Sequence, residues 1–242
     1  TMSVSGFGEK EEFSNNPEEE GTKKFSEQNL YVGQNIKGIY TTTKFKAEIA
    51  VLEAVSNGLD AQLLRIGNIT NRYSDGKFQI NINDNAFARR IKSFVEIGAF
   101  PKYMLTHAIE LTPVDVCADA VLKILEHNSP CNVFHLYDTN LLPINIFYDT
   151  ILERGINLTP VSNTLMTYII KGILSDDSKK SIISGIVQDL DKDKKFTYIS
   201  KVGLDATFTT GFNWSTFDSE YVNKCFDYFE NVGFIDKNLE EH

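Results

Sequence analysis

Tyr40 and Lys44 are the residues whose types and spacing most clearly permit catalysis. They stand four positions apart near the start of a predicted helix, and this spacing places both side chains on one helix face. A phenol has a pKa of about 10 and is a weak acid or base at neutral pH. A neighbouring ammonium group favours the phenolate, so that such a phenol can hydrogen-bond a carbonyl oxygen and give it a proton as hydride arrives. The same spacing also occurs on solvated helix faces, so the pair alone is a weak signal.

Two predicted elements position this pair. A helix is expected over residues 36–56, with Asn57 and Gly58 ending it, because glycine takes the left-handed C-terminal conformation without strain. The short apolar run 61–66 is typical of a buried strand. A helix followed by a buried strand is half of a parallel α/β unit, and a second strand is expected over 131–137.

The remaining elements are predicted from helix start and stop signals. Helices are expected over 87–97, 112–127, 145–154, 158–190 (two helices divided near Asp176) and 215–232. Thr112 is the expected N-cap of the helix over 112–127, and Ser215 or Thr216 is that of the last helix. The polar segment 8–28 has few apolar residues and is expected to be an exposed acidic loop.

Charge and composition restrict the class of partner. The 242 residues carry a formal net charge of −9, which disfavours a sequence-independent grip on nucleic-acid phosphates. No apolar run reaches the ~18 residues of a membrane span, so we expect no membrane contact. Three widely separated cysteines, Cys117, Cys131 and Cys225, match neither a metal-ligand pattern nor a disulfide framework. With no signal peptide recognised, these features favour a cytoplasmic protein.

No metal site is expected. Asp189, Asp191 and Asp193 alternate as at the start of a calcium-binding loop. That loop needs glycine at its sixth position and glutamate at its twelfth, where this sequence has Lys194 and Ser200. The three aspartates are therefore not expected to bind calcium.

The sequence around the Tyr–Lys pair resembles a known signature. Residues Tyr40–Glu48 are similar to the Tyr-x-x-Ser-Lys-x-x-Ala-Glu pattern of extended short-chain dehydrogenases, with Thr43 in place of the commoner serine. The opening segment Thr1–Gly6 resembles the strand end that carries the catalytic serine or threonine of those enzymes. The resemblance implies that Thr1, Tyr40 and Lys44 are catalytic.

Further motifs, in order along the chain, narrow the resemblance. They are Phe25–Gln34, Leu64–Ile69, Arg72–Gln79, Asn85–Phe87, Glu110–Asp115, Gly211–Trp214 and Gly233–Phe234. Together they are similar to thioester reductases, the terminal reductase domains of non-ribosomal peptide synthetases. The Arg72–Gln79 block could shape a substrate entrance, or it could simply hold a loop through turn hydrogen bonds.

The resemblance implies an α/β fold, namely the C-terminal part of a Rossmann-type extended short-chain dehydrogenase with a smaller, mainly helical substrate domain. Residues 1–75 would belong to the NADPH-binding domain, to which the chain would return at about 112–138. Residues 76–111 and 139–242 would form the substrate- and carrier-binding subdomain. The active site is expected in the cleft between the two.

The resemblance also implies a reaction. A peptidyl or acyl thioester on the phosphopantetheine of an upstream carrier domain would accept hydride from NADPH and leave as an aldehyde, with further reduction to an alcohol open. Tyr40 and Thr1 would hydrogen-bond the forming oxyanion, and Lys44 would hold the nicotinamide ribose. The cofactor-binding residues that the resemblance implies are Tyr40, Lys44, Ile66, Gly67, Asn68 and Ile69.

One feature of the family is missing from the sequence. No Gly-rich phosphate loop follows a predicted strand, so the pyrophosphate site is expected to lie in a missing N-terminal half of the Rossmann domain. The isolated chain is therefore expected to hold NADPH poorly and to be inactive. Three alternatives stay open: a carboxylic acid or fatty acyl-CoA reductase, a non-catalytic fragment, and a nucleotide-sugar epimerase, against which the Arg72–Gln79 block argues.

Overall fold

The computed structural model describes residues 23–34, 36, 38–127, 129–177, 179–186, 196–199, 203 and 207–236. Through their described residues, the segments of the chain form two compact units. Unit 1 comprises Thr1–Ile69, Glu110–Thr139 and Lys192–Ser215, and unit 2 comprises Thr70–Ile109, Asn140–Asp191 and Thr216–His242. The segment that ends at Ser215 belongs to unit 1, and the segment that begins at Thr216 belongs to unit 2.

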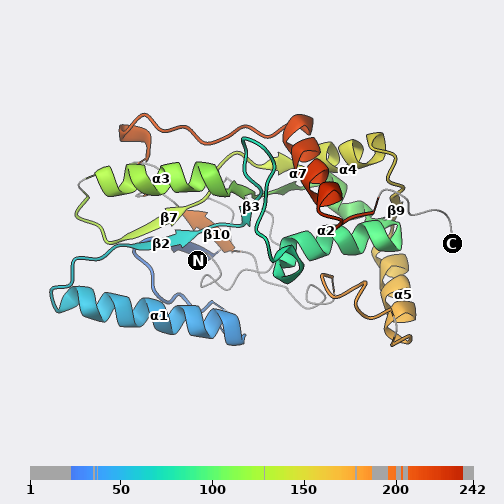
Figure 1. Cartoon of the computed structure of the whole chain (residues 1–242). Coiled ribbons are helices and arrows are strands. Elements are labelled where there is room, and N and C mark those ends of the chain that lie inside the picture. Colours follow the sequence, from blue (N-terminus) through green and yellow to red (C-terminus); the bar gives the residue numbers. More distant parts are fainter. Residues whose placement is uncertain are drawn as a thin grey trace. The chain divides into compact units, whose positions relative to one another are not determined.

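Unit 1 contains parallel strands with a helix on either side. Its elements are β1 (Lys23–Ser26), α1 (Ile39–Ser56), β2 (Leu63–Ile66), β6 (Thr112–Pro113), α3 (Val114–Glu126), β7 (Val133–Leu136) and β10 (Phe196–Ile199). β1 pairs in parallel with β10, and β2 pairs in parallel with β7. Figure 1 shows α3 on one side of β2 and β7 and α1 on the other. This arrangement is that of a Rossmann-type α/β fold, as predicted.

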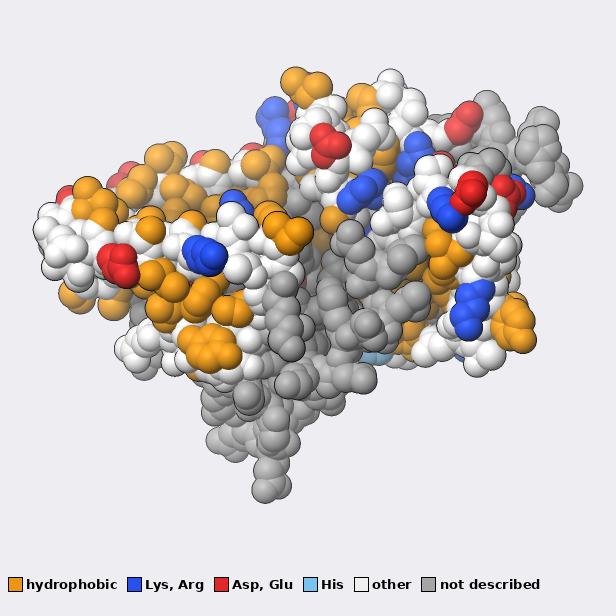
Figure 2. Space-filling model, turned by 90° about the horizontal axis from the view of Figure 1, so that it is seen from below, with side chains coloured by type: hydrophobic (Ala, Val, Ile, Leu, Met, Phe, Trp, Pro, Cys, Tyr) orange, Lys and Arg blue, Asp and Glu red, His pale blue; other side chains and the backbone are white. Residues whose placement is uncertain are grey.

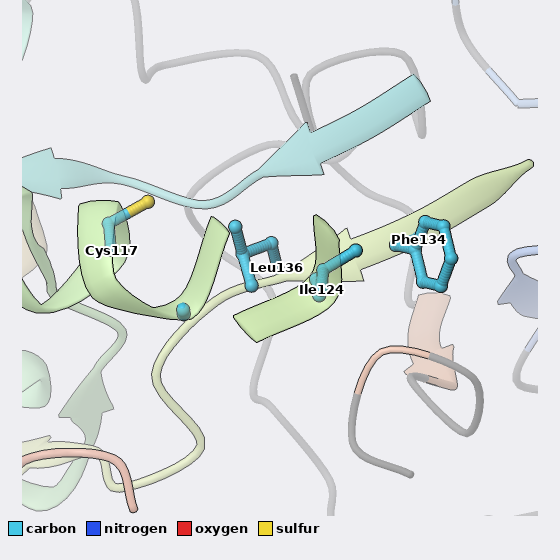
Figure 3. Close-up of a cluster of buried hydrophobic side chains, with 5 residues drawn as sticks. Cys117, Ile124, Phe134 and Leu136 are labelled. Atoms are coloured by element: carbon cyan, nitrogen blue, oxygen red, sulfur yellow. The ribbon is translucent and has the colours of Figure 1, made fainter. Parts of the chain in front are cut away.

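The core of unit 1 lies between α3 and β7. Cys117, Ala120 and Ile124 recur at helical spacing on one face of α3, and Phe134 and Leu136 alternate along β7 toward it (Figure 3). All five side chains are buried, and partly buried hydrophobic side chains of β2 pack against them. Burying one large apolar side chain contributes about 1.5–3 kcal/mol. This cluster therefore packs β7, and β2 beside it, against α3.

Unit 2 is mainly helical. Its helices are α2 (Ala86–Ile97), α4 (Ile144–Glu153), α5 (Asn163–Leu174), α7 (Ser219–Asn231) and the 3₁₀ turns η2 (Ile82–Asp84) and η3 (Lys102–Thr106). Its short strands are β4 (Ala99–Pro101), β5 (Ala108–Ile109), β8 (Leu142–Pro143) and β9 (Thr159–Val161), and the chain passes from unit 1 to unit 2 within β3 (Ile69–Thr70). β4 pairs in parallel with β9, and β5 pairs antiparallel with β8.

Helix ends in unit 2 confirm the glycine stop signals. Gly98 follows α2 with φ of 61°, and Gly155 follows α4 with φ of 81°. Arg154, at the end of α4, lies 2.8 Å from both Glu230 and Asp227 of α7. The guanidinium therefore ties the C-terminal ends of α4 and α7 together.

The predicted acidic loop is wrong at its C-terminal end. Residues Lys23–Ser26 form β1, and Phe25 is fully buried, with its ring stacked 5.6 Å from the ring of His135. The buried aromatic ring of Phe25 and the pairing with β10 place this short segment within unit 1. Residues 8–22 of the predicted loop lie outside the described residues.

Two predicted helix caps are also wrong. α3 begins at Val114 without a side-chain cap, because the Thr112 hydroxyl donates instead to the buried carboxylate of Glu110. α7 begins at Ser219, and the side chain of Asp218 accepts the Tyr221 N–H at 3.1 Å. The Thr112 hydroxyl, which was expected to cap the helix, donates instead to a carboxylate two residues earlier in the chain.

Over its described residues, the segment predicted as two helices over 158–190 contains one helix, α5. Residues Thr159–Val161 form β9, and Ser162 caps α5 by accepting the Leu165 N–H. Pro160 favours an extended residue before it, and β-branched neighbours favour a strand. After α5, residues 179–186 form successive turns where the second helix was expected. The three aspartates of the rejected calcium loop lie outside the described residues.

Over the described part of the chain, no helix is long and apolar enough to cross a membrane. The same residues contain no cluster of three or more His, Cys, Asp or Glu side chains that could hold a metal ion.

Candidate active site

The first turns of α1 carry the Tyr–Lys pair. The Lys44 Nζ lies 5.5 Å from the centroid of the Tyr40 ring, so the structure brings these two predicted residues together. Tyr40 is 59% exposed, and Lys44 is exposed as well. Their donor groups are therefore open to a ligand. Thr43, which stands where serine is commoner in the signature, donates its hydroxyl to the Ile39 carbonyl at 2.7 Å and so supports the helix itself.

A buried ion pair holds α1 on β2. The Arg65 guanidinium of β2 lies 2.9 Å from the Glu48 carboxylate of α1, and both residues are almost fully buried. Both carboxylate oxygens accept hydrogen bonds from Arg65, which is the bidentate geometry that guanidinium and carboxylate favour. Glu48 lies one helical turn beyond Lys44 on the same helix. The pair therefore fixes the helix that carries the catalytic candidates to the strand that leads to the cofactor candidates.

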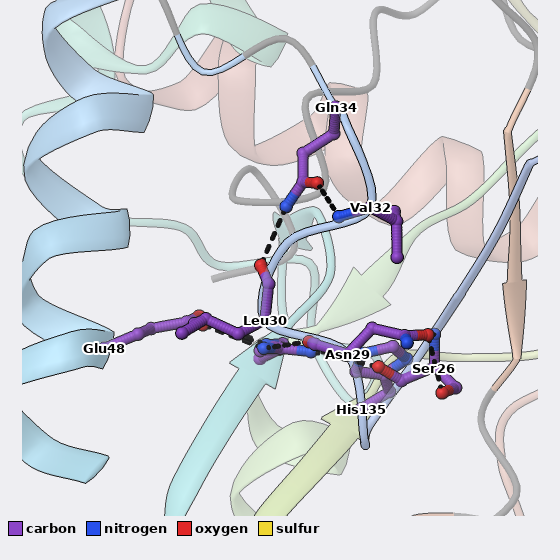
Figure 4. A network of polar contacts seen from close by, with 8 residues as sticks. Ser26, Asn29, Leu30, Val32, Gln34, Glu48 and His135 are labelled. Atoms are coloured by element: carbon purple, nitrogen blue, oxygen red, sulfur yellow. Dashed lines mark hydrogen bonds and ion pairs between the residues drawn. The ribbon is translucent and has the colours of Figure 1, made fainter. Parts of the chain in front are cut away.

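Arg65 also orders the segment that follows β1. It donates to the carbonyl of Ser26 at 3.2 Å and to that of Asn29 at 2.8 Å, and its guanidinium lies 4.6 Å from the Phe25 ring centroid. Figure 4 shows Ser26, Asn29, Glu48 and His135 close together, and the Arg65 Nη1 lies 3.1 Å from the His135 Nε2.

A buried glutamine then folds the segment further. The Gln34 side chain donates to the Leu30 carbonyl at 2.9 Å and accepts the Val32 N–H at 2.7 Å (Figure 4). The segment Phe25–Gln34, which precedes α1, is thus held in place by hydrogen bonds from Arg65 and Gln34.

The predicted cofactor-binding backbone lies at the carboxyl end of β2. Ile66 is the last residue of that strand, and the Gly67 N–H donates to the Leu136 carbonyl of β7 at 3.0 Å. The Asn68 carbonyl accepts the Thr112 N–H at 2.8 Å. Ligands of parallel α/β sheets bind outside the carboxyl ends of the strands, which is where Gly67 and Asn68 lie.

A carboxyl group that was not among the predicted site residues lies against this strand end. Glu110 accepts the Asn68 N–H at 2.8 Å and the Thr112 hydroxyl. Burial raises the Glu110 pKa to about 7, although the hydrogen bonds from Thr112 and Asn68 act in the opposite direction. Glu110 is the first residue of the motif Glu110–Asp115, which resembles thioester reductases but was not expected to contribute a site residue. An acidic residue directly before the apolar Leu111 was the signal that could have marked it as buried.

The structure joins the predicted residues in two groups. Tyr40 and Lys44 lie together on α1, and Gly67 and Asn68 lie together at the end of β2. The ion pair of Glu48 with Arg65 connects the two elements. Thr1, the third predicted catalytic residue, lies outside the described residues.

The Arg72–Gln79 block belongs to unit 2 and makes contacts within itself. Arg72 Nε lies 3.2 Å from Asp75 Oδ1, and the Lys77 N–H donates to Asp75 at 3.1 Å. The Asn71 side chain donates to the Gly76 carbonyl at 2.7 Å. These contacts support the interpretation that the block holds a loop.

The donor set of unit 1 fits the nicotinamide end of a dinucleotide. A phenol and an ammonium group, both hydrogen-bond donors, stand side by side on an exposed helix face. Gly67, directly after β2, has no side chain of its own. A bound nicotinamide cofactor supplies a hydride. Lys44 would hold the ribose of this cofactor, and the backbone of residues 66–69 would lie beside its nicotinamide ring.

Solved structures with the same fold define the class of the chain. It is similar to a thiolation-reductase di-domain from an archaeal non-ribosomal peptide synthetase, with a TM-score of 0.72 and 25% identity over 98% of this chain. It is also similar to the terminal R domain of the myxalamid PKS-NRPS pathway (TM-score 0.77, 20% identity, 98% of this chain). A third similar structure is the reductase domain of the aureusimine biosynthetic cluster (0.74, 22%, 96%). The fold is that of the extended short-chain dehydrogenase/reductases.

A family model that matches the first half of the chain identifies its family. Residues 1–121 match the model of an NAD-binding family described as Male sterility protein, and the chain belongs to this family. No curated protein matches the chain in sequence. The chain spans 56–58% of the length of the three reductase structures.

Proposed function

We propose that this chain is the C-terminal part of an NADPH-dependent thioester reductase that releases a carrier-bound peptidyl or acyl chain as an aldehyde. One observation carries the proposal: 98% of the chain matches a thiolation-reductase di-domain at 25% identity. The exposed Tyr40–Lys44 pair at the start of α1 supports it, because these groups suit reduction of a carbonyl carbon.

The side chains of unit 1 would act on the substrate oxygen. Hydride addition to the thioester carbon moves an electron pair onto the carbonyl oxygen. The Tyr40 hydroxyl, and that of Thr1, would donate hydrogen bonds to this oxyanion and stabilise it. Tyr40 would supply the proton to this oxygen. Collapse of the resulting hemithioacetal breaks the carbon–sulfur bond and returns the thiol to phosphopantetheine.

The rest of the cofactor would be held by residues that this chain does not contain. The chain spans just over half the length of the similar reductase domains, and its sequence has no Gly-rich phosphate loop. Exposed hydrophobic side chains on α1 are consistent with a further chain segment that covers this helix. Ile39 is 90% exposed, and Figure 2 shows hydrophobic side chains spread over the region where α1 lies in Figure 1. We propose that an N-terminal half of the Rossmann domain supplies the pyrophosphate site.

The test is an assay of the full-length protein with matched thioesters. An acyl group is offered on a phosphopantetheine-bearing carrier domain, on coenzyme A and as the free acid, with NADPH or NADH as reductant. We expect consumption of NADPH and aldehyde formation with the carrier-bound thioester. Reduction of only the coenzyme A thioester, or of the free acid with ATP, would favour the acyl-CoA or carboxylic acid reductase. No turnover with any substrate would favour a non-catalytic fragment.

A further inference from the structure

Glu110 is a buried acidic residue whose two oxygens are both engaged. The residue is 3% exposed; one oxygen accepts the Asn68 N–H at 2.8 Å and the other accepts the Thr112 hydroxyl. A carboxyl group in a protein interior costs free energy unless its oxygens find donors. The donors here come from the backbone that follows β2 and from β6, so the carboxyl joins these two segments.

Gly67 shows how closely the carboxyl approaches the strand end. A Cβ atom built on Gly67 would lie 2.6 Å from the Glu110 Oε1 and 2.7 Å from the Tyr137 Cβ. Real Cβ atoms do not approach other atoms so closely, so only glycine fits this position. Glu110 therefore lies directly against the Gly67–Asn68 peptide.

The same carboxyl connects the ends of two parallel strands. The Thr112 hydroxyl, which donates to Glu110, also accepts the Asp138 N–H at 3.2 Å. Asn68 follows β2 and Asp138 follows β7, and these strands pair in parallel. Glu110 thus holds, directly and through Thr112, the two chain segments at the edge of the sheet where ligands bind in this fold class.

We propose that Glu110 is a positioning residue for the bound cofactor and holds the Gly67–Asn68 peptide in the conformation that the nicotinamide end requires. The inference rests on the proposed function, which places the nicotinamide end at these residues. A carboxylate accepts hydrogen bonds more strongly than a neutral carboxyl group. The hold on Asn68 is therefore stronger when Glu110 is ionised, and cofactor affinity rises with pH.

Two other titratable groups beside Glu110, Cys117 and Tyr137, stay protonated near neutral pH. On α3, burial and then the Glu110 charge raise the pKa of Cys117 to about 11. Burial, followed by the charges of Glu110 and Glu27, raises the pKa of Tyr137 above its usual range. Asp138 takes part through its backbone N–H, while its carboxylate accepts the Ser215 N–H. Among the described residues, no cation contributes to the Glu110 shift.

The first experiment needs no cofactor. In the full-length protein, amide hydrogen exchange at Asn68 is compared between the wild type, Glu110→Gln and the control Glu126→Gln, which alters an exposed carboxylate on α3. We expect Asn68 to exchange about tenfold faster in Glu110→Gln, because a charge-assisted hydrogen bond is lost. The control should match the wild type. Unchanged exchange at Asn68 in Glu110→Gln would overturn the inference.

The second experiment measures the NADPH dissociation constant by calorimetry between pH 6 and 8. In the wild type we expect binding to tighten by about tenfold across this range, and in Glu110→Gln we expect a weak and nearly constant affinity. Thr112→Val removes a donor that lowers the Glu110 pKa, so its profile should move to higher pH. If Glu110→Gln does not fold, the shift of the Thr112→Val pH profile relative to the wild type tests the inference instead.

The outcomes separate the inference from the function on which it rests. Identical pH profiles in the wild type and both variants would overturn the positioning role alone. A folded wild type that binds no nicotinamide cofactor at any pH would overturn the proposed function.

Discussion

Arg65 of β2 donates hydrogen bonds to both carboxylate oxygens of Glu48 of α1, and neither side chain is more than 6% exposed. In an interior of low polarity, such a pair is costly to break from one side. The residues also sit between the two groups of candidate site residues, so the ion pair sets where Tyr40 stands relative to the end of β2.

Removing one partner of this pair should strongly destabilise the protein. Arg65→Met leaves the Glu48 carboxylate without its partner and removes the Arg65 hydrogen bonds to the Ser26 and Asn29 carbonyls. We expect the free energy of unfolding to fall by about 3–5 kcal/mol, measured by chemical denaturation. Replacing Glu48 with leucine as well should recover part of the loss.

The control for that prediction is an exposed ion pair. Lys123 and Glu126 on α3 lie 2.9 Å apart, with 39% and 63% of their side chains exposed. Lys123→Met should change stability by less than about 1 kcal/mol. Equal losses in Lys123→Met and Arg65→Met would mean that the buried pair has no special role.

A methyl group at position 67 should be tolerated poorly. The Cβ of Gly67→Ala would meet the Glu110 carboxylate and Tyr137, both at less than 3 Å. We expect a loss of about 1–3 kcal/mol in thermal or chemical unfolding, together with weaker cofactor binding. Gly172→Ala on α5 is the matched control, because nothing lies within 4 Å of its Cβ. That change should be neutral or stabilise by up to about 1 kcal/mol, since alanine favours a helix.

Glu110 should make stability depend on pH. The pKa of Glu110 is raised from 4.5 to about 7, so the folded protein binds this proton more tightly than the unfolded chain. Stability is therefore greatest below the unfolded pKa and falls as pH rises to the folded pKa, by an amount on the order of 3 kcal/mol. We expect the difference in unfolding free energy between the wild type and Glu110→Gln to shrink across that window. A difference that stays constant from pH 4.5 to pH 7 would contradict the raised pKa.

The isolated 242-residue chain should bind NADPH weakly. The sequence contains no Gly-rich loop after a strand, and such a loop supplies most of the pyrophosphate contacts of a Rossmann-type site. Calorimetry on the isolated chain should give a dissociation constant well above the micromolar range. A low-micromolar value would mean that the described residues hold the cofactor without an N-terminal half.

Local signals predicted the elements that position the site, and tertiary contacts decided what those signals missed. Helix periodicity with glycine ends placed α1, α2 and α4 within a few residues, because capping glycine and apolar spacing are local properties. β1 was missed because its four residues are ordered by pairing with β10, which lies far along the sequence. A strand with so distant a partner leaves little trace in its own composition.

Some residues of the candidate site could likewise be predicted from local sequence patterns, and others could not. The Tyr40–Lys44 pair could be read from spacing, since a helix brings residues four positions apart together. Glu110 could not, because its role depends on contacts with Asn68, which precedes it by 42 positions, and with Gly67. The Thr112 hydroxyl was assigned to a helix end, but it donates to the Glu110 carboxylate and accepts the N–H of Asp138, which lies 26 positions further along the chain.

Tyr40→Phe is the sharpest test of the catalytic assignment. The change removes one hydroxyl from a side chain that is 59% exposed, so packing and fold should survive. The loss is that of a donor to the oxygen on which charge develops, which typically costs on the order of 10²–10³ in rate. In the full-length protein we expect turnover of a carrier-bound thioester, followed by NADPH absorbance, to fall by about a hundredfold or more. Cofactor affinity should change little, because the ribose contact is assigned to Lys44, whereas Lys44→Ala should weaken both binding and rate.

Tyr168→Phe on α5, 73% exposed, is the matched control and should keep wild-type turnover. A folded Tyr40→Phe variant with near-native turnover would refute the assignment and favour a non-catalytic role for this chain.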